Sequence, residues 1–369
     1  MGFLARFISR FFSRRSNDGD QNKTRSNRTA QSQNRAFAEG FCRRFSLSEM
    51  RAATRCFSKS LRIASDGYGS VYKGTIDSDN VVAIKRFVGD SKEQFRTEVQ
   101  LLCQLRHPNI ISIIGFCEEK EECLIVYNYM SNGALSKYLD NPLDRDPVLQ
   151  LSWKQRLNIC IGVASALQHL HTGVKHSIVH RFVNSSNILL DEQFVPKLSD
   201  FGRCMTGPRT LSNGLIRWDS VTVDGTYGCI APEAFSGQLT EKSDVYSFGL
   251  VLLEALCGKS RPVDIFNSLK TGETSLDMID PFLTRQIAPD CLKKFVDIIQ
   301  RCVRPSGAER HTMGEVEVEL ECALELQGSG DAINQLKESG TTTTTSLAPS
   351  PPPPPINENF SNIYLREWL

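Results

Sequence analysis

Residues 180–187 read HRFVNSSN, and residues 200–202 read DFG. Further runs flank this pair: residues 82–85 read VAIK, a glutamate follows at Glu98, and residues 231–233 read APE. Each run is too short to be informative alone. Their order along about 150 residues makes a chance match negligible, so they decide how the rest of the chain is interpreted.

The hydrophobic pattern before residue 130 predicts strands around one helix. Short β-branched and aromatic runs over residues 61–87 are interrupted by the polar residues 77–80, which predict a hairpin turn. Residues 93–105 have the spacing of a helix, whereas residues 110–114 and 124–127 return to strand-like runs. This part of the chain is therefore expected to be rich in β-structure.

Helices are expected to dominate after residue 151. An apolar stripe recurs there at helical spacing, formed by Trp153, Leu157, Ile161, Ala164 and Leu167. Residues 245–257 are apolar nearly all round, as expected for a buried core helix. A small β-rich half followed by a larger helical half predicts an α+β fold with two lobes.

Composition excludes several classes of protein. The chain has 369 residues and a net charge of +1, so its overall charge does not indicate nucleic-acid binding. It also has no nucleic-acid-binding motif. Twelve cysteines lie between Cys42 and Cys322 without C-x-x-C spacing, so they are expected to be small buried hydrophobes, reduced in the cytosol. The chain lacks the run of about 18 apolar residues that a transmembrane helix needs.

The order and spacing of the five opening runs resemble those of protein kinases. Longer stretches narrow the resemblance to plant receptor-like kinases, nearest to their FERONIA-like and Pto-like branch. These stretches are residues 45–49 (FSLSE), 157–162 (LNICIG), 186–191 (SNILLD) and 239–249 (LTEKSDVYSFG). The resemblance covers about three quarters of the chain and implies a relative of the receptor-like cytoplasmic kinases.

The resemblance also divides the chain. It implies a bilobal kinase-like domain over residues 45–327, with an N-lobe at about 45–127, a hinge at 128–130 and a C-lobe at about 131–327. Residues 1–44 are then an N-terminal segment and flexible linker. Residues 328–369, which contain a threonine run and a proline run, are a low-complexity tail.

By the same resemblance, ATP and Mg²⁺ are expected in the cleft between the lobes. Lys85 would face the α- and β-phosphates, with Glu98 holding its ammonium group in an ion pair. Asp200 and Asn187 would supply oxygen ligands to Mg²⁺. The other residues expected around the nucleotide are Ile63, Gly69, Val71 and Ala83, the gatekeeper Tyr127, and the hinge residues Asn128, Tyr129 and Met130.

Structural roles are implied for charged residues of the larger lobe. Asp244 should brace the loop at residues 180–187, and Arg310 should pair with Glu233. The stretch between Gly258 and Asp280 is shorter than in the family pattern, so the surface there should be altered.

The loop departs from the family pattern where a catalytic aspartate is expected. Phe182 follows His180 and Arg181, and a phenyl ring has no lone pair to accept the proton of a substrate hydroxyl. Loss of a general base costs roughly 10²–10⁴-fold in rate, and the ring also competes with the acceptor for space. Asn184 replaces a lysine expected near the transferring phosphate, which removes a cation.

The glycine-rich loop is degraded as well. Ala64 and Asp66 occupy the first two glycine positions, Gly69 keeps the third, and Gly67 lies between. An aspartate there repels phosphates, and side chains obstruct close approach of the backbone. Nucleotide affinity is expected to fall without vanishing, because the expected lysine, glutamate and metal ligands remain.

These departures favour a pseudokinase, a scaffold or allosteric partner of active receptor kinases, over a weakly active serine/threonine kinase. No side chain is assigned as catalytic in the loop that carries His180, Arg181, Phe182 and Asn184. Another kinase could phosphorylate the hydroxyls at Thr210, Ser212, Ser220, Thr222 and Thr226. Phosphates there would pair with Arg181, and a plain solvated loop is the equal alternative.

The N-terminus has the pattern of a membrane-surface helix. Residues 1–15 place aromatic and aliphatic side chains on one helical face, with Arg6 and Arg10 on the other. Eight basic and two acidic residues lie between residues 1 and 35. A cytoplasmic protein held peripherally at the plasma membrane is therefore expected. The alternatives are an organellar transit peptide, lipidation at Gly2 and a disordered tail.

Overall fold

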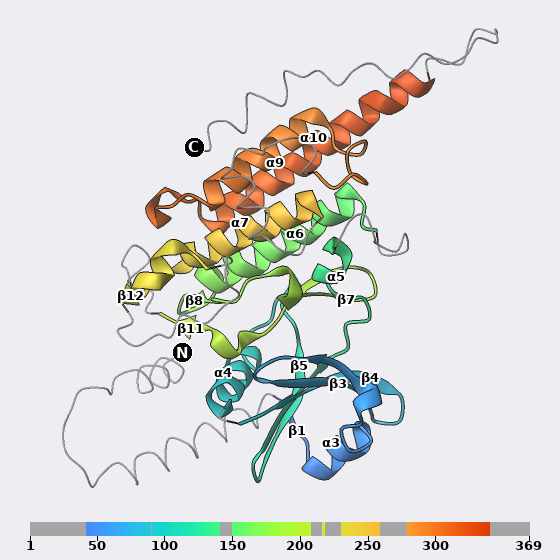
Figure 1. Cartoon of the computed structure of the whole chain (residues 1–369), viewed down its shortest axis with the longest axis vertical. Coiled ribbons are helices and arrows are strands. Elements are labelled where there is room, and N and C mark those ends of the chain that lie inside the picture. Colours follow the sequence, from blue (N-terminus) through green and yellow to red (C-terminus); the bar gives the residue numbers. More distant parts are fainter. Residues whose placement is uncertain are drawn as a thin grey trace. The chain divides into compact units, whose positions relative to one another are not determined.

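The computed structural model describes residues 42–89, 91–140, 150–207, 216–217, 230–258 and 279–339. The chain divides into two units, Met1–Arg43 and Arg44–Leu369, and β1 (Arg43–Arg44) lies at their junction. All other elements labelled in Figure 1 belong to the second unit. The predicted helix at residues 1–15, the five candidate phosphorylation hydroxyls and the stretch at 259–278 lie outside the described residues.

An antiparallel sheet forms the first lobe. Its strands run in the order β5–β6–β4–β3–β2. Their bounds are β2 (Arg62–Ser65), β3 (Gly69–Ile76), β4 (Asn80–Phe87), β5 (Ile113–Glu119) and β6 (Glu122–Asn128). The predicted hairpin joins β3 to β4, where Ile76 pairs with Asn80. Asp77 and Ser78 take positive φ angles of 48° and 75° in this turn, so the turn prediction is confirmed.

One face of this sheet is covered by helix α3 (Leu47–Ala53). Because side chains alternate along a strand, every second residue of β4 and β6 points to this side. Val82, Ile84 and Val126 pack there with Met50 in a buried cluster. The helix begins after Ser46, whose side chain forms a capping box with that of Glu49.

Helix α4 (Lys92–Leu102) confirms the helix predicted over residues 93–105, although it ends earlier. It lies against β5, β6 and the short 3-10 turn η5 (Phe201–Arg203). The strand predicted at 110–114 is wrong in its first part, because β5 begins only at Ile113. The amide of Ile111 donates to the carbonyl of Leu198 at 3.0 Å instead. Periodicity cannot distinguish such a short buried apolar run from a strand.

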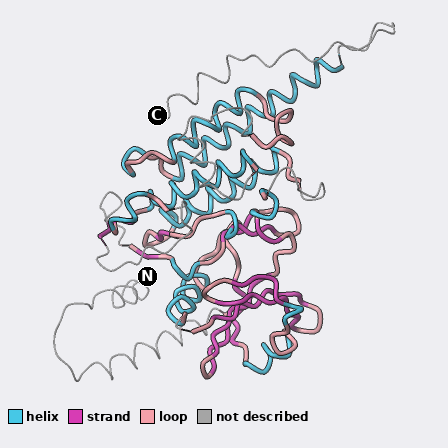
Figure 2. Tube along the Cα trace, viewed as in Figure 1, coloured by secondary structure: helices cyan, strands magenta, loops and turns pink. Residues whose placement is uncertain are grey.

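Helices build the second lobe. Their bounds are α5 (Ser136–Leu139), α6 (Trp153–Gln168), α7 (Glu241–Cys257), α9 (Pro289–Cys302) and α10 (Met313–Ser339). Helix α6 packs against α10, and α7 packs against α9. Every residue of α7 from Ser243 to Cys257 is buried, which confirms the core helix predicted at 245–257. Figure 2 shows most strands in one lobe and most helices in the other, in agreement with the α+β prediction.

Short strands frame two loops between the lobes. One small sheet contains β7 (Gly133–Ala134), β9 (Ile188–Leu190) and β10 (Pro196–Leu198), a second contains β8 (Ile178–Val179) and β11 (Met205–Thr206), and a third contains β12 (Ile216–Arg217) and β13 (Gln238–Leu239). The HRFVNSSN loop joins β8 to β9, and the DFG loop joins β10 to β11. Because β8 pairs with β11 and β9 with β10, the two loops lie side by side.

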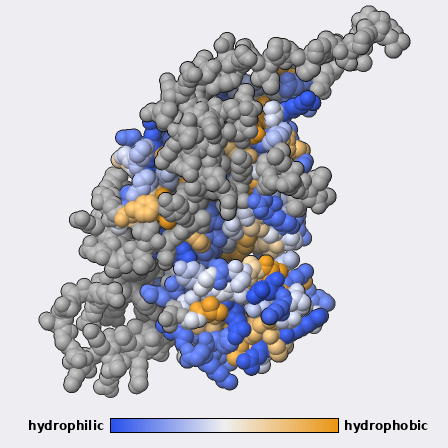
Figure 3. Space-filling model, in the orientation of Figure 1, coloured by the Kyte–Doolittle hydropathy of each residue, from blue (hydrophilic) through white to orange (hydrophobic). Residues whose placement is uncertain are grey.

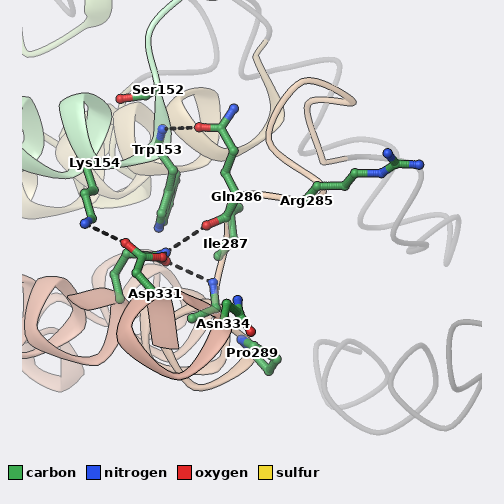
Figure 4. A pocket seen from close by; sticks show the side chains of 11 residues that line it. Ser152, Trp153, Lys154, Arg285, Gln286, Ile287, Pro289, Asp331 and Asn334 are labelled. Carbon is green, nitrogen blue, oxygen red and sulfur yellow. Dashed lines mark hydrogen bonds and ion pairs between the residues drawn. The ribbon is translucent and has the colours of Figure 1, made fainter. Parts of the chain in front are cut away.

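Helix α10 extends into the segment that is predicted as a low-complexity tail. The low-complexity tail is predicted to begin at residue 328, whereas α10 continues to Ser339. A Cβ on Gly330 would come within 2.5 Å of the Ala288 Cβ, so this glycine permits close packing rather than ending the helix. In the part of α10 after residue 328, the Asp331 carboxylate forms an ion pair with the Lys154 ammonium at 2.5 Å. The pair lies beside a pocket of about 270 Å³ (Figure 4). The limits of the domain itself stay a prediction.

Surface and cysteine properties agree with a compact second unit. Cys56 and Cys322 are exposed and the other described cysteines are buried. Burial raises the pKa of Cys117 and of Cys160 to about 12, so these thiols stay neutral.

Figure 3 shows a mostly hydrophilic face over the described residues, with scattered apolar patches. None of the helices in the described ranges is long and apolar enough to cross a membrane.

Candidate functional site

A buried charge cluster lies where the two lobes meet. The Lys85 Nζ is 3.0 Å from Glu98 Oε2 and 2.6 Å from Asp200 Oδ1. These side chains come from β4, from α4 and from the turn before η5, so the cluster joins the two lobes. The ion pair predicted between Lys85 and Glu98 is confirmed.

Burial and charge act against each other in this cluster. Burial would lower the pKa of Lys85, but the carboxylates of Glu98 and Asp200 outweigh it and raise that pKa. Burial would raise the pKa of Asp200, but Lys85 holds it below its ordinary range. The pKa of Glu98 is raised by its burial, which Lys85 only partly offsets. The lysine is therefore a fixed cation, and Asp200 is ionised.

The sheet face opposite α3 carries the predicted nucleotide residues. Val71 pairs with Lys85 across β3 and β4, and Ala83 pairs with Tyr127 across β4 and β6. Paired residues of an antiparallel sheet share a face, as do Ala83 and Lys85 two positions apart, so these four residues lie together. Burial raises the pKa of Tyr127 well above its ordinary value, and the nearby Glu98 adds to this, so the hydroxyl stays neutral.

The remaining nucleotide candidates lie on the rims of this face. Ile63 of β2 is 50% exposed, a large apolar side chain open to solvent. Asn128 ends β6 as an exposed residue, and Tyr129 and Met130 follow it half-buried. The Lys73 ammonium lies 4.9 Å from the centre of the Tyr129 ring, which links β3 to the predicted hinge.

The DFG loop is fastened to α4. Asp200 has a positive φ of 66°, a left-handed conformation that turns the chain sharply into η5. The Phe201 amide donates to Glu98 Oε1 at 3.2 Å, and its ring is fully buried. That ring lies edge-on to His180, with ring centres 5.0 Å apart. The two loops are thereby packed together directly beside the charge cluster.

Asp244, in the first turn of α7, anchors the HRFVNSSN loop. Its carboxylate accepts the backbone amides of His180 and Arg181, each at 2.7 Å, and lies 2.9 Å from His171 Nε2. Arg181 has a positive φ of 70°, so these hydrogen bonds hold a strained backbone. Burial lowers the pKa of His180, which keeps its ring neutral. The bracing role predicted for Asp244 is confirmed.

The outer part of the same loop is organised around the Phe182 carbonyl. This oxygen accepts hydrogen bonds from Nδ2 of Asn184 at 3.2 Å and from Nδ2 of Asn187 at 2.9 Å. The Asn184 Oδ1 accepts the amides of Ser186 and Asn187 and so caps the turn η4 (Ser185–Asn187). Asn184 is therefore engaged within the loop. No described residue donates to the Asn187 amide oxygen, which suits a metal ligand.

The glycine-loop backbone is bound by its own aspartate. Asp66 Oδ1 accepts the amides of Tyr68 at 2.8 Å and Gly69 at 2.9 Å. The sequence indicates only a repulsive charge at Asp66, and this turn is not apparent from it. A Cβ on Gly69 would lie 2.2 Å from the Arg86 carbonyl oxygen, so glycine is required there, whereas Gly67 has open space around it.

Two further observations complete the site. Arg310 Nη1 lies 2.7 Å from Glu233 Oε1, which confirms the predicted pair. Arg203, which sequence analysis does not single out, places its guanidinium 4.1 Å from the centre of the Phe182 ring and 4.3 Å from that of Tyr68. Its only signal in the sequence is a cation directly after DFG.

Comparisons with known proteins agree with this geometry. Residues 58–320 match the model of the family described as protein tyrosine and serine/threonine kinase. Among the curated relatives, the receptor-like protein kinase ANXUR2 of Arabidopsis thaliana is 46% identical over 80% of this chain and 35% of its own length. The receptor-like protein kinase FERONIA of the same plant is 44% identical over 79% of this chain and 33% of its own.

The chain thus spans about a third of the length of the curated relatives it matches. The matched part carries the charge cluster, the braced loop and both lobes. The chain belongs to the protein tyrosine and serine/threonine kinase family, and its relatives are plant receptor-like kinases.

Proposed function

We propose that this chain is a pseudokinase, a signalling module that holds Mg²⁺–ATP weakly and acts as a scaffold or allosteric partner of active receptor kinases. The observation that carries the proposal is Phe182 at the position of the catalytic base. The loop around it keeps its anchored backbone, with the Phe182 amide 3.3 Å from His180 Nδ1. The substitution therefore changes the chemistry of one side chain in an otherwise ordered loop.

Four carboxylates of the described residues around the site are already engaged. Asp200 and Glu98 bind Lys85, and Asp244 binds backbone amides. Asp66 accepts two amides of its own loop. A base must reach the hydroxyl proton at about 2.6–3.2 Å. Because these four carboxylates are engaged in other contacts, they support the proposal that none of them replaces the catalytic base toward a substrate hydroxyl.

Nucleotide binding rests on the retained cluster. When bound, Mg²⁺–ATP supplies a phosphoryl group whose charge the metal partly neutralises. Lys85 is fixed to contact phosphate oxygens, and Asp200 and Asn187 offer a carboxylate and an amide oxygen to the metal. The apolar face at Val71 and Ala83 offers a surface for the base. These donor types fit the expected ligands.

Weak affinity is supported by the turn at Asp66. Its carboxylate occupies the amides of Tyr68 and Gly69, which are then not available to a phosphate. The same oxygen brings negative charge toward the nucleotide. Both effects act on the phosphates and leave contacts with the base intact.

The second candidate is a weakly active serine/threonine kinase. The intact cluster of Lys85, Glu98 and Asp200 favours it, because phosphoryl transfer depends mostly on positioning and charge stabilisation. Loss of the base alone need not abolish such a reaction.

Radiolabel transfer from ATP separates the two candidates. The full chain is incubated with Mg²⁺ and labelled ATP, alone and with a generic protein substrate, beside Lys85→Met and the surface control Lys92→Met. Incorporation no higher than that of Lys85→Met supports the pseudokinase. Incorporation by the wild type and Lys92→Met that Lys85→Met loses would establish the kinase instead.

Melting temperature against Mg²⁺–ATP tests the nucleotide. Ligand that binds only the folded state raises stability by mass action, so millimolar ATP is expected to raise the melting temperature by a few degrees. Lys85→Met should show a smaller rise. An unchanged wild-type melting temperature would remove nucleotide from the proposal.

Attachment to the membrane rests on the basic, aromatic pattern of residues 1–15, which lie outside the described residues. A fluorescent fusion that lacks these residues is expected to leave the plasma membrane. Retention there would refute the anchor.

A further inference from the structure

Arg203 brings a cation to the meeting point of three loops. Its guanidinium lies over the rings of Tyr68 and Phe182, at 4.3 and 4.1 Å from their centres. Tyr68 belongs to the glycine loop and Phe182 to the HRFVNSSN loop, while Arg203 ends η5 directly after DFG. The guanidinium therefore contacts both rings and links the three loops.

Two rings contact the Arg203 guanidinium, and no described residue forms an ion pair with it or accepts a hydrogen bond from it. The residue is only partly buried. A guanidinium carries five N–H donors in its plane, in a fork that matches two oxygens of a phosphate. Contacts with two rings restrict its position. Such an arrangement is preorganised for an anion.

The position of this anion site follows from the two rings. Tyr68 belongs to the glycine loop and Phe182 occupies the position of the catalytic base, and both rings contact the Arg203 guanidinium. In kinases the glycine loop covers the phosphates and the base position faces the acceptor hydroxyl, so these contacts place the guanidinium near the terminal phosphate. Asp200, three residues earlier in the chain, contacts Lys85 at 2.6 Å. Because asparagine replaces the expected lysine at position 184, that region lacks a cation to stabilise the charge of the transferring phosphate.

We propose that Arg203 binds the terminal phosphate of the nucleotide, with Tyr68 and Phe182 as its platform. This rests on the proposed nucleotide binding and adds selectivity to it. In this proposal Lys85 contacts the α- and β-phosphates. Arg203 contacts only the terminal phosphate, so the site binds a triphosphate more tightly than a diphosphate. Phe182 then has a binding role: its ring orients a cation that replaces the lysine missing at 184.

The test compares two nucleotides in the full chain. Titration calorimetry with Mg²⁺–ATP and Mg²⁺–ADP is carried out on wild type, Arg203→Gln, Arg203→Lys, Phe182→Leu and the distant surface control Arg301→Gln. The wild type and the control are expected to prefer ATP by about tenfold or more, as a charged hydrogen-bonded contact can supply. Arg203→Gln should bind the two nucleotides equally, with unchanged affinity for ADP. Arg203→Lys and Phe182→Leu should retain part of the preference.

The outcomes separate this inference from the proposed function. A wild type that binds neither nucleotide overturns both. A wild type that binds both equally, or an Arg203→Gln variant that keeps the ATP preference, overturns the role of Arg203 alone. A purely structural role would weaken ATP and ADP to the same extent, so the ratio decides. Melting temperatures without nucleotide establish that each variant is folded, and Arg203→Lys gives a second reading if Arg203→Gln is not.

Discussion

The two ends of the HRFVNSSN loop keep the kinase pattern to different degrees. At the inner end, the backbone amides of His180 and Arg181 bind the buried Asp244 at 2.7 Å. At the outer end, Phe182 and Asn184 replace groups expected to act on substrate, and their polar contacts stay within the loop. The inner end determines whether the loop folds, and the outer end determines what it does.

This difference teaches that folding and chemistry are separable in this site. Loss of Asp244 would leave the amides of His180 and Arg181 without their acceptor, so the loop backbone depends on it. Phe182 is only partly buried, and its ring finds a partner in Arg203. A catalytic side chain can therefore be lost while the surrounding backbone remains in place.

The largest effect is expected when a base is restored at 182. Phe182→Asp should raise radiolabel transfer to a generic substrate by roughly 100-fold or more, because a carboxylate at this position can accept the proton of the substrate hydroxyl. Adding Lys85→Met should abolish the gain. If Phe182→Asp stays silent, the glycine loop or Asn184 limits the outer end as well.

A large loss of stability is expected at the inner end. Asp244→Ala leaves two buried amides without an acceptor, which should lower the free energy of unfolding by about 2–5 kcal/mol. Urea denaturation measures the change. Asp297→Ala, which removes an exposed pair with Arg301 on α9, should cost no more than about 0.5 kcal/mol. Equal effects of the two variants would contradict the anchoring role.

The glycine loop offers a matched pair of smaller changes. Gly69→Ala forces a Cβ to 2.2 Å from the Arg86 carbonyl oxygen, so it should destabilise the fold by roughly 1–3 kcal/mol. Gly67→Ala enters open space and should change stability by less than about 0.5 kcal/mol. Thermal denaturation of both variants measures the difference. A tolerated Gly69→Ala would mean that β3 and β4 separate more easily than this packing indicates.

The smallest effect concerns acid stability through Glu233. Burial would raise its pKa, but the hydrogen bond and charge of Arg310, together with further hydrogen bonds, outweigh this and lower the pKa below the ordinary value of 4.5. The unfolded state then binds the proton more readily, so the contribution is present above about pH 4.5 and is lost as pH falls through the lowered value. Between pH 5 and 3, Glu233→Gln should flatten the fall in unfolding free energy by less than about 1.4 kcal/mol per pH unit. Superimposable pH curves would exclude this linkage.

Some errors in the sequence-based fold have a common cause. The run at 110–114 and the segment that follows residue 328 have local patterns compatible with several structures. Ile111 binds Leu198, and Gly330 packs on Ala288, in each case a distant segment. Arg156, within the apolar helix α6, is likewise fully buried because it pairs with Asp280 at 2.5 Å. Tertiary contacts override local preference at such positions.

The sequence by itself determined the family, the two-lobed order of strands and helices, and the residue types at 85, 98, 182 and 200. Order, spacing and periodicity are properties of the chain and need no coordinates. Only the tertiary structure decided that Asp66 binds its own loop and that Arg203 contacts both Tyr68 and Phe182. These contacts depend on where separate loops meet, because a side chain's partner is set by distance in space.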